Sequence, residues 1–175
     1  MDEIQKKILI IEDEAPLLHI LETTLKREGF QVFTAGSGKV GLAAALRFRP
    51  HLVLLDLIMP GMNGIALLKK LRANEWGRDV PVIVLTNLSD TEAIIEAVEF
   101  DSIRIVEGEK DLKLSNVDVV RETITTYIGT RIRNGVYDFL VKKNVSLREV
   151  VERVKERLED TWKNHHQISM SAVSV

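Results

Sequence analysis

Acidic residues stand at the ends of two apolar runs in this chain. Asp56 follows the run LVLL, and Glu12 and Asp13 follow the run KILII. A run this short and this apolar is typical of a strand that is buried on both faces of a parallel sheet. Two further runs end in groups that can contact an anion, because VPVIVL is followed by Thr86 and VYDFLV by Lys142. Together, carboxylates, a hydroxyl and an ammonium could bind a hard cation and phosphate oxygens.

The spacing of the apolar residues predicts five strands that alternate with helices. Such alternation is typical of right-handed βαβ units and of an α/β fold, here a doubly wound parallel sheet of strand order 2-1-3-4-5. The switch point of that order lies between strands one and three. The side chains that end strands one, three, four and five would therefore meet at one edge of the sheet. Strands are expected at 7–13, 31–35, 52–56, 80–86 and 136–141, and helices at 15–28, 41–48, 65–73, from 91 onward and at 147–158.

The acidic residues at this edge predict a metal site. Three carboxylates close together repel one another and raise one another's pKa unless a cation lies among them. Mg²⁺ suits such a site because it binds a few carboxylates together with waters and phosphate oxygens. Each residue also has a simpler interpretation: Asp56 could cap a helix, Thr86 could merely favour a strand, and Lys142 could be solvated. It is the complete set after four separate strands that predicts a magnesium-dependent site.

Four motifs together resemble the receiver domain of response regulators, the family of two-component signalling. They are IIEDE at 10–14, LLDLIMPGMNG at 54–64, VLTN at 84–87 and DFLVKK at 138–143. The similarity covers residues 7–99 and 135–158. It implies a flavodoxin-like receiver at 1–160, interrupted before strand five by an insertion at 101–134. The sequence of the insertion adds a helical arm, and the weakly charged C-terminal tail at 161–175 is expected to fray.

The resemblance implies a role for each residue at the sheet edge. Asp56 would be the phosphoacceptor, taking a phosphoryl group as an aspartyl phosphate. Asp13 and Asp56 would bind Mg²⁺ directly, and Glu12 would bind it through a water. The backbone carbonyl of Ile58 would complete the protein ligands. Lys142 would stabilise charge on the transferring oxygens.

The resemblance also implies a conformational switch. The hydroxyl of Thr86 would contact the phosphoryl group, and Phe139 would turn inward as Thr86 moves, although an ordinary core phenylalanine is an equal alternative. Phosphorylation would shift the populations of two arrangements of the face made by helix four, strand five and helix five. The expected partners are a histidine kinase or phosphotransfer protein and a downstream protein.

Four residues depart from the usual receiver pattern. Lys143 stands where a proline usually follows the lysine, and Asn87 stands where a small residue is usual, which would narrow access to the site. Ile58 and Leu88 occupy two positions that tune hydrolysis of the acyl phosphate. Because both are apolar and cannot orient an attacking water, a long-lived phosphorylated state is expected.

The insertion at 101–134 has its own pattern. Its sequence favours a strand at 102–106, a charged loop at 107–113 and a helix at 117–133. It could be an ornament packed beside helix four. Alternatively, it could reshape the output face for a partner or for a homodimer.

Composition narrows the classes of function. A chain of 175 residues that is 45% hydrophobic can bury one core, and its net charge of −2 gives no general attraction to nucleic acid or acidic lipid. The absence of cysteine excludes disulfides and thiolate metal sites. No apolar run has the length of a membrane span or of a signal peptide. A cytoplasmic protein is expected, without direct nucleic-acid or membrane binding and without room for an output domain after Leu158.

Two rival functions are compatible with parts of the sequence. A dehalogenase-like phosphatase also uses an aspartate nucleophile, but it needs a second acid two residues later, where this chain has Ile58. Turnover of an external substrate is therefore not expected. A degenerate receiver that binds partners without phosphate is the alternative that Lys143 and Asn87 leave open.

Overall fold

The computed structural model describes residues 5–86, 136–142 and 146–171. Within them, five strands form one parallel sheet in the order β2-β1-β3-β4-β5, which confirms the predicted topology. The insertion at 101–134 and the helix expected from residue 91 lie outside the described residues. The strands are β1 (Lys7–Ile11), β2 (Gln31–Ala35), β3 (Leu52–Asp56), β4 (Val82–Thr86) and β5 (Val136–Val141).

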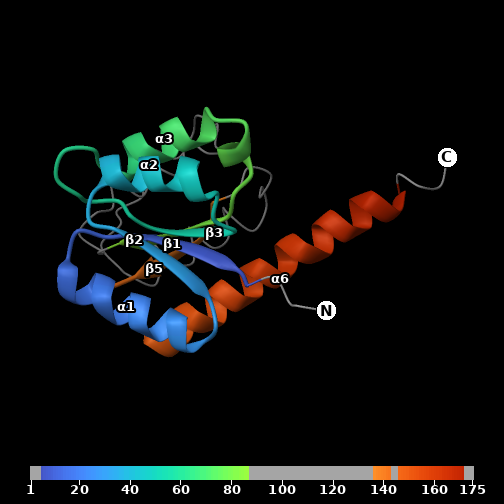
Figure 1. The fold of residues 1–175 in the computed structure, drawn as a ribbon, viewed down its shortest axis with the longest axis horizontal. Helices are drawn as coiled ribbons and strands as arrows, with labels where there is room; N and C mark the ends of the chain where they lie inside the picture. The colour runs from blue at the N-terminus through green and yellow to red at the C-terminus, as the bar shows by residue number, and fades with distance from the viewer. Residues whose placement is uncertain (1–4, 87–135, 143–145, 172–175) are drawn as a thin grey trace, which may run out of the picture.

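Helices cover both faces of the sheet. Figure 1 shows α2 and α3 on one face and α1 and α6 on the other. A short 3₁₀ helix, η1, follows α3. The helices are α1 (Ala15–Arg27), α2 (Gly38–Phe48), α3 (Gly64–Arg72), η1 (Trp76–Arg78) and α6 (Leu147–Ser171).

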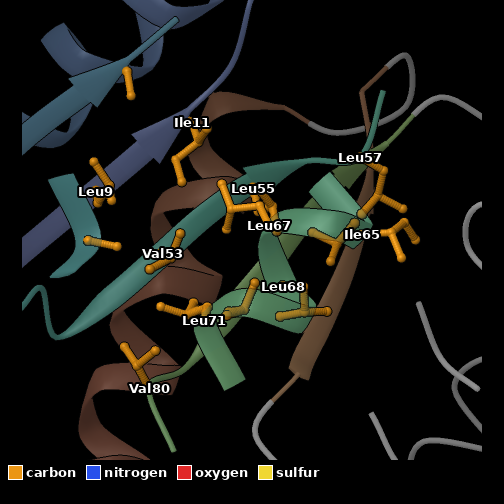
Figure 2. Close-up of a cluster of buried hydrophobic side chains, with 14 of the residues drawn as sticks. Leu9, Ile11, Val53, Leu55, Leu57, Ile65, Leu67, Leu68, Leu71 and Val80 are labelled. Atoms are coloured by element: carbon orange, nitrogen blue, oxygen red, sulfur yellow. The ribbon is translucent and has the colours of Figure 1, made fainter. Parts of the chain in front are cut away.

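Alternate side chains of the central strands enter two separate hydrophobic clusters. Leu9 and Ile11 of β1 lie in the cluster beneath α2 and α3, whereas Ile8 and Ile10 lie in the cluster beneath α1 and α6. In Figure 2 the first cluster is closed by three leucines of α3, Leu67, Leu68 and Leu71. Burial on both faces explains why these strands are almost uniformly apolar.

β4 and α2 begin at other residues than their apolar patterns indicated. β4 begins at Val82 rather than at residue 80. Pro81 has no N–H for the ladder, although its carbonyl still accepts a hydrogen bond from Val53 at 2.9 Å. α2 begins at Gly38 rather than at residue 41, because a glycine is a weak helix signal even where close packing requires it. A Cβ on Gly38 would collide with the main chain of Met62.

The last helix corrects an expectation about the C-terminal tail. Ser146 caps it as predicted, since its Oγ accepts a hydrogen bond from the Glu149 amide at 3.2 Å. The helix was expected to end between Leu158 and Trp162 and the tail from Thr161 to fray, but α6 continues to Ser171. Figure 1 shows its C-terminal half extending beyond the sheet. The expected fraying is therefore wrong for 161–171.

Among the described residues, no helix combines the length and the apolar character that crossing a bilayer requires.

Candidate functional site

Asp56 lies at the carboxyl end of a strand that is buried along its whole length. All five residues of β3 are buried, and Asp56 itself is 2% exposed. The strand lies between β1 and β4, so its end is the centre of the sheet edge. The Asp56 Oδ1 atom accepts a hydrogen bond from the Ile58 amide at 3.1 Å. The carboxylate is therefore held in one orientation by its own loop.

Close packing fixes the loop that follows Asp56. The Gly64 amide donates to the Leu57 carbonyl at 2.9 Å, which closes the loop onto the end of β3. A Cβ on Gly64 would lie 2.7 Å from the Leu57 Cα and would also collide with the Asp56 carbonyl. Asn63 then caps α3 by accepting a hydrogen bond from the Ala66 amide at 2.8 Å. Only glycine fits at residue 64 without displacing the backbone beside Asp56.

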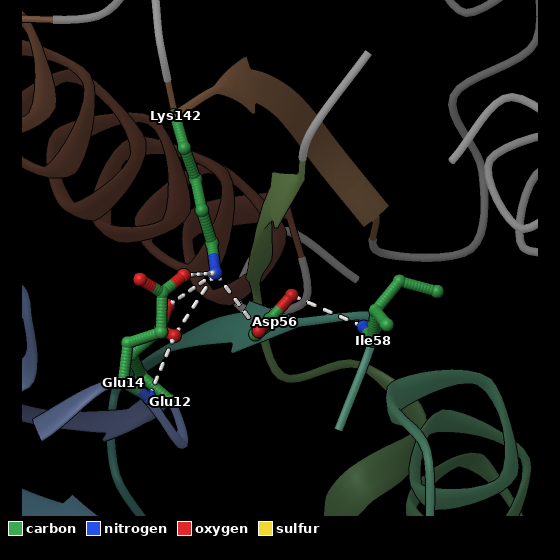
Figure 3. Close-up of polar contacts among 5 residues, drawn as sticks. All are labelled: Glu12, Glu14, Asp56, Ile58 and Lys142. Atoms are coloured by element: carbon green, nitrogen blue, oxygen red, sulfur yellow. Dashed lines mark hydrogen bonds and ion pairs between the residues drawn. The ribbon is translucent and has the colours of Figure 1, made fainter. Parts of the chain in front are cut away.

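Lys142, the residue after β5, supplies a cation to this carboxylate. Its Nζ donates to Asp56 Oδ2 at 2.9 Å and to Glu12 Oε1 at 2.9 Å, and a longer contact of 3.4 Å joins it to Glu14 Oε1. Figure 3 shows the ammonium between the Glu12 and Glu14 side chains and that of Asp56. The Lys142 side chain is only 9% exposed. The ion pairs therefore lie where water screens them little.

Burial shifts the pKa values of the two carboxyl groups and the ammonium at this site. Burial raises the pKa of Glu12 from 4.5 to about 7, against the effect of its hydrogen bond with Lys142. The pKa of Asp56 is also raised by burial, while hydrogen bonds from Lys142 and the Ile58 amide oppose the rise. Burial alone would lower the pKa of Lys142, but its hydrogen bonds to Asp56 and Glu12 outweigh that effect and raise it. Lys142 is therefore charged at neutral pH, whereas Glu12 is poised between its two forms.

The carboxylates fit a hard divalent cation. Ligand oxygens of Glu12, Asp13 and Asp56 all lie within 4.8 Å of one another. Glu12 Oε2 is buried and has no hydrogen-bond partner among the described residues, although Lys142 Nζ lies 2.9 Å from it. Asp13 is exposed, so waters and phosphate oxygens can reach the cluster. One ammonium does not balance three carboxylates, and a small oxygen-binding cation such as Mg²⁺ suits this geometry.

For the two predicted switch residues, the structure describes the backbone only. Thr86 is the last residue of β4 and pairs with Val141, and Phe139 of β5 pairs with Val84. The side chains of Thr86 and Phe139 fall outside what the structure describes, so their switch roles stay predictions. The metal-binding role of the Ile58 carbonyl also stays a prediction. The departures noted at Asn87, Leu88 and Lys143 also lie outside the described residues.

One contact was missed by the sequence reasoning. Glu14 was counted within the motif IIEDE but was given no role. The structure brings its carboxylate to the ammonium of Lys142, more than a hundred residues away. The available signal was its position next to Asp13, at the edge where the strand-five lysine was expected.

Comparison with known proteins identifies the family. A model of the response regulator receiver domain matches residues 8–117, more than half of the chain. The chain belongs to the response regulator receiver family. Membership places it in two-component signalling, where receivers are phosphorylatable switches. The match ends before β5, so the place of Lys142 in this receiver rests on the sheet order and on the contacts described above.

Relatives and solved structures agree with this assignment. The DNA-binding response regulator MtrA of Mycobacterium bovis is 40% identical over 99 residues, which cover 57% of this chain and 42% of that protein. The receiver thus spans less than half of the length of that relative. The REC domain of AraT, a response regulator from Geobacillus stearothermophilus, has a TM-score of 0.64 at 22% identity and covers 93% of this chain and 99% of its own. A CheY-like receiver domain protein from Methanospirillum hungatei has a TM-score of 0.60 at 23% identity, with coverages of 91% and 98%. At these identities the two structures show the fold alone.

Proposed function

We propose that this receiver accepts a phosphoryl group on Asp56 in a magnesium-dependent reaction, with a histidine kinase or a phosphotransfer protein as the donor. The observation that carries the proposal is the 2.9 Å contact between Asp56 Oδ2 and Lys142 Nζ, beside the carboxylates of Glu12 and Asp13. An aspartate that only shaped its loop would need the hydrogen bond from the Ile58 amide. It would not need a buried ammonium and two further carboxylates.

The proposed step is a simple displacement at phosphorus. A carboxylate oxygen of Asp56 forms a bond to phosphorus while the bond from phosphorus to the imidazole nitrogen of the donor breaks. The electron pair of the broken bond stays on that nitrogen. The hydrogen bonds of Lys142 keep its amine protonated, and this positive charge can neutralise a phosphoryl oxygen once Asp56 is phosphorylated. The charge is in place before the reaction, so little reorganisation is needed.

The metal would be held by the acidic cluster. Asp13 and Asp56 would bind Mg²⁺ directly, Glu12 would bind it through a water, and the Ile58 carbonyl would complete the protein ligands. When bound, Mg²⁺ supplies the positive charge that offsets charge on the phosphoryl oxygens. The support for this set is the spacing of the three carboxylates and the surplus of negative charge around Lys142.

The output is proposed to be a change in protein contacts. Thr86 would move toward the phosphoryl group and Phe139 would follow, which would favour one arrangement of the face made by helix four, β5 and α6. A downstream protein, or a second copy of the chain, would bind that face or the insertion. We expect this to happen in the cytoplasm, without turnover of an external substrate and without direct nucleic-acid or membrane binding. DNA binding by a longer protein containing this receiver is the alternative that the name of MtrA suggests.

A phosphate-independent binding module remains the rival function, and one gel separates the two. Wild-type protein is incubated with acetyl phosphate and Mg²⁺ and run on a phosphate-affinity gel beside Asp56→Asn. Asp79→Asn serves as the matched control, because Asp79 is an exposed aspartate just before β4, at the opposite edge of the sheet. The proposal predicts a slower band for wild type and Asp79→Asn, and none for Asp56→Asn or in EDTA. Equal labelling of Asp56→Asn, or no labelling of wild type, would refute it.

A further inference from the structure

Glu14 contacts the catalytic ammonium without belonging to the metal cluster. Its Oε1 lies 3.4 Å from Lys142 Nζ, and its side chain is 60% exposed. The carboxylates that lie within 4.8 Å of one another are those of Glu12, Asp13 and Asp56. Glu14 therefore brings a fourth carboxyl group to the site, on its solvent side.

The Glu14 side chain does not cap the helix that it precedes. Glu14 is the N-cap residue of α1, yet its side chain makes no capping hydrogen bond. Its amide instead donates to Glu12 Oε1 at 3.2 Å, which holds the Glu14 backbone against the buried carboxylate. Its carboxylate contacts Lys142, and Figure 3 shows it on the side of the ammonium away from Asp56.

We infer that Glu14 is a specificity-determining residue that slows phosphorylation of Asp56 by highly charged small-molecule donors. The inference rests on the proposed function, in which Lys142 must engage the transferring phosphoryl group. A carboxylate already on Lys142 competes with the incoming oxygens for the ammonium, and it repels a donor in proportion to the donor's charge. A donor presented by a protein surface brings its own contacts and orientation, which a free dianion lacks. Glu14 would thus favour protein donors over free metabolites.

The effect has a predictable size and dependence on charge. Because Glu14 is more than half exposed, its charge should act with the modest strength of surface charges, so Glu14→Gln should raise the rate constant with acetyl phosphate about threefold. Acetyl phosphate is a dianion at neutral pH and phosphoramidate a monoanion. Since Coulomb energy scales with the donor's charge, the increase with phosphoramidate should be the square root, about 1.7-fold. Both increases should shrink as salt is added.

The experiment compares rate constants for labelling of the full chain in Mg²⁺, with both donors, at low and high ionic strength. Glu14→Asp keeps the charge and should keep the slow wild-type rate, and circular dichroism checks that each variant folds. Asp79→Asn makes the same change in net charge at the opposite sheet edge and should leave both rates unchanged. The inference is overturned if Glu14→Gln is no faster than Asp79→Asn, or if its increase is the same for both donors and independent of salt. A wild-type chain that neither donor labels at Asp56 would instead overturn the proposed function.

Discussion

Replacing Lys142 by methionine tests the electrostatics of the site through stability alone. Glu12 is fully buried and the Asp56 side chain is 3% exposed, so the ammonium they share cannot be replaced by water. Removing one partner of a buried ion pair typically costs about 3 to 5 kcal/mol, because the remaining charge is left uncompensated. We expect Lys142→Met to lose about 3 kcal/mol of unfolding free energy near pH 8 without Mg²⁺.

The sign of the pH dependence follows from the raised carboxyl pKa values. A carboxyl whose pKa is higher in the folded than in the unfolded chain stabilises the fold at low pH, and this stability is lost as pH rises through the folded pKa. Glu12, with a pKa of about 7, already behaves this way in the wild type. Without the ammonium, the pKa values of Glu12 and Asp56 rise further. The loss caused by Lys142→Met should therefore shrink below about 1 kcal/mol near pH 5.5, which is below the pKa of Glu12.

Urea denaturation followed by circular dichroism, in EDTA at the two pH values, measures these losses. Lys155→Met is the matched control, since Lys155 forms a 2.5 Å ion pair with Glu28 whose side chains are 48% and 37% exposed. Such a surface pair should be worth less than about 1 kcal/mol and should not change over this pH range. An equal loss for the two variants near pH 8, or a loss from Lys142→Met that does not depend on pH, would refute the burial argument.

Three further predictions concern the metal, the sheet and the loop. Mg²⁺ should raise the melting temperature of wild type more near pH 8 than near pH 6, because below its pKa of about 7 Glu12 must first lose a proton; an equal shift would contradict this. His51 Nδ1 accepts a hydrogen bond from the Lys7 amide at 2.9 Å, and burial lowers the pKa of His51. His51→Ala should therefore lose roughly 1 kcal/mol of unfolding free energy above the unfolded pKa near 6.5. In urea titrations this loss should fade as pH falls below that value. Gly64→Ala should cost about 1 to 3 kcal/mol by the same assay and slow labelling of Asp56, whereas Gly36→Ala, where a Cβ meets nothing within 4 Å, should do neither.

The ends of the buried strands could be predicted because burial leaves a clear trace in the sequence. In β3 an unbroken apolar run stops at Asp56, and in β5 a run stops one residue before Lys142. Once strand order was inferred from βα alternation, parallel geometry alone brought these ends to one edge. The contact between Lys142 and Asp56 thus follows from topology, without any local signal that joins the two residues.

Features that depend on side-chain geometry or on close packing could not be predicted in this way. The contact of Glu14 with Lys142 depends on how two long side chains are oriented, and no periodicity encodes that. The start of α2 was missed because Gly38 is chosen for its close approach to Met62 and not for helix propensity. Fraying from Thr161 onward was inferred from the weakly charged sequence, but a helix can continue on its backbone hydrogen bonds, and α6 extends to Ser171.

The most direct test of the account is to locate the phosphoryl group by mass spectrometry. Wild-type protein treated with acetyl phosphate and Mg²⁺ is digested, and each peptide is examined before and after hydroxylamine, which cleaves acyl phosphates. A hydroxylamine-sensitive phosphoryl group is expected on the peptide that contains Asp56, and it should be absent when EDTA replaces Mg²⁺. A phosphoryl group found on another residue, or one that forms equally well in EDTA, would contradict the central claim that the edge around Asp56 is a magnesium-dependent acceptor.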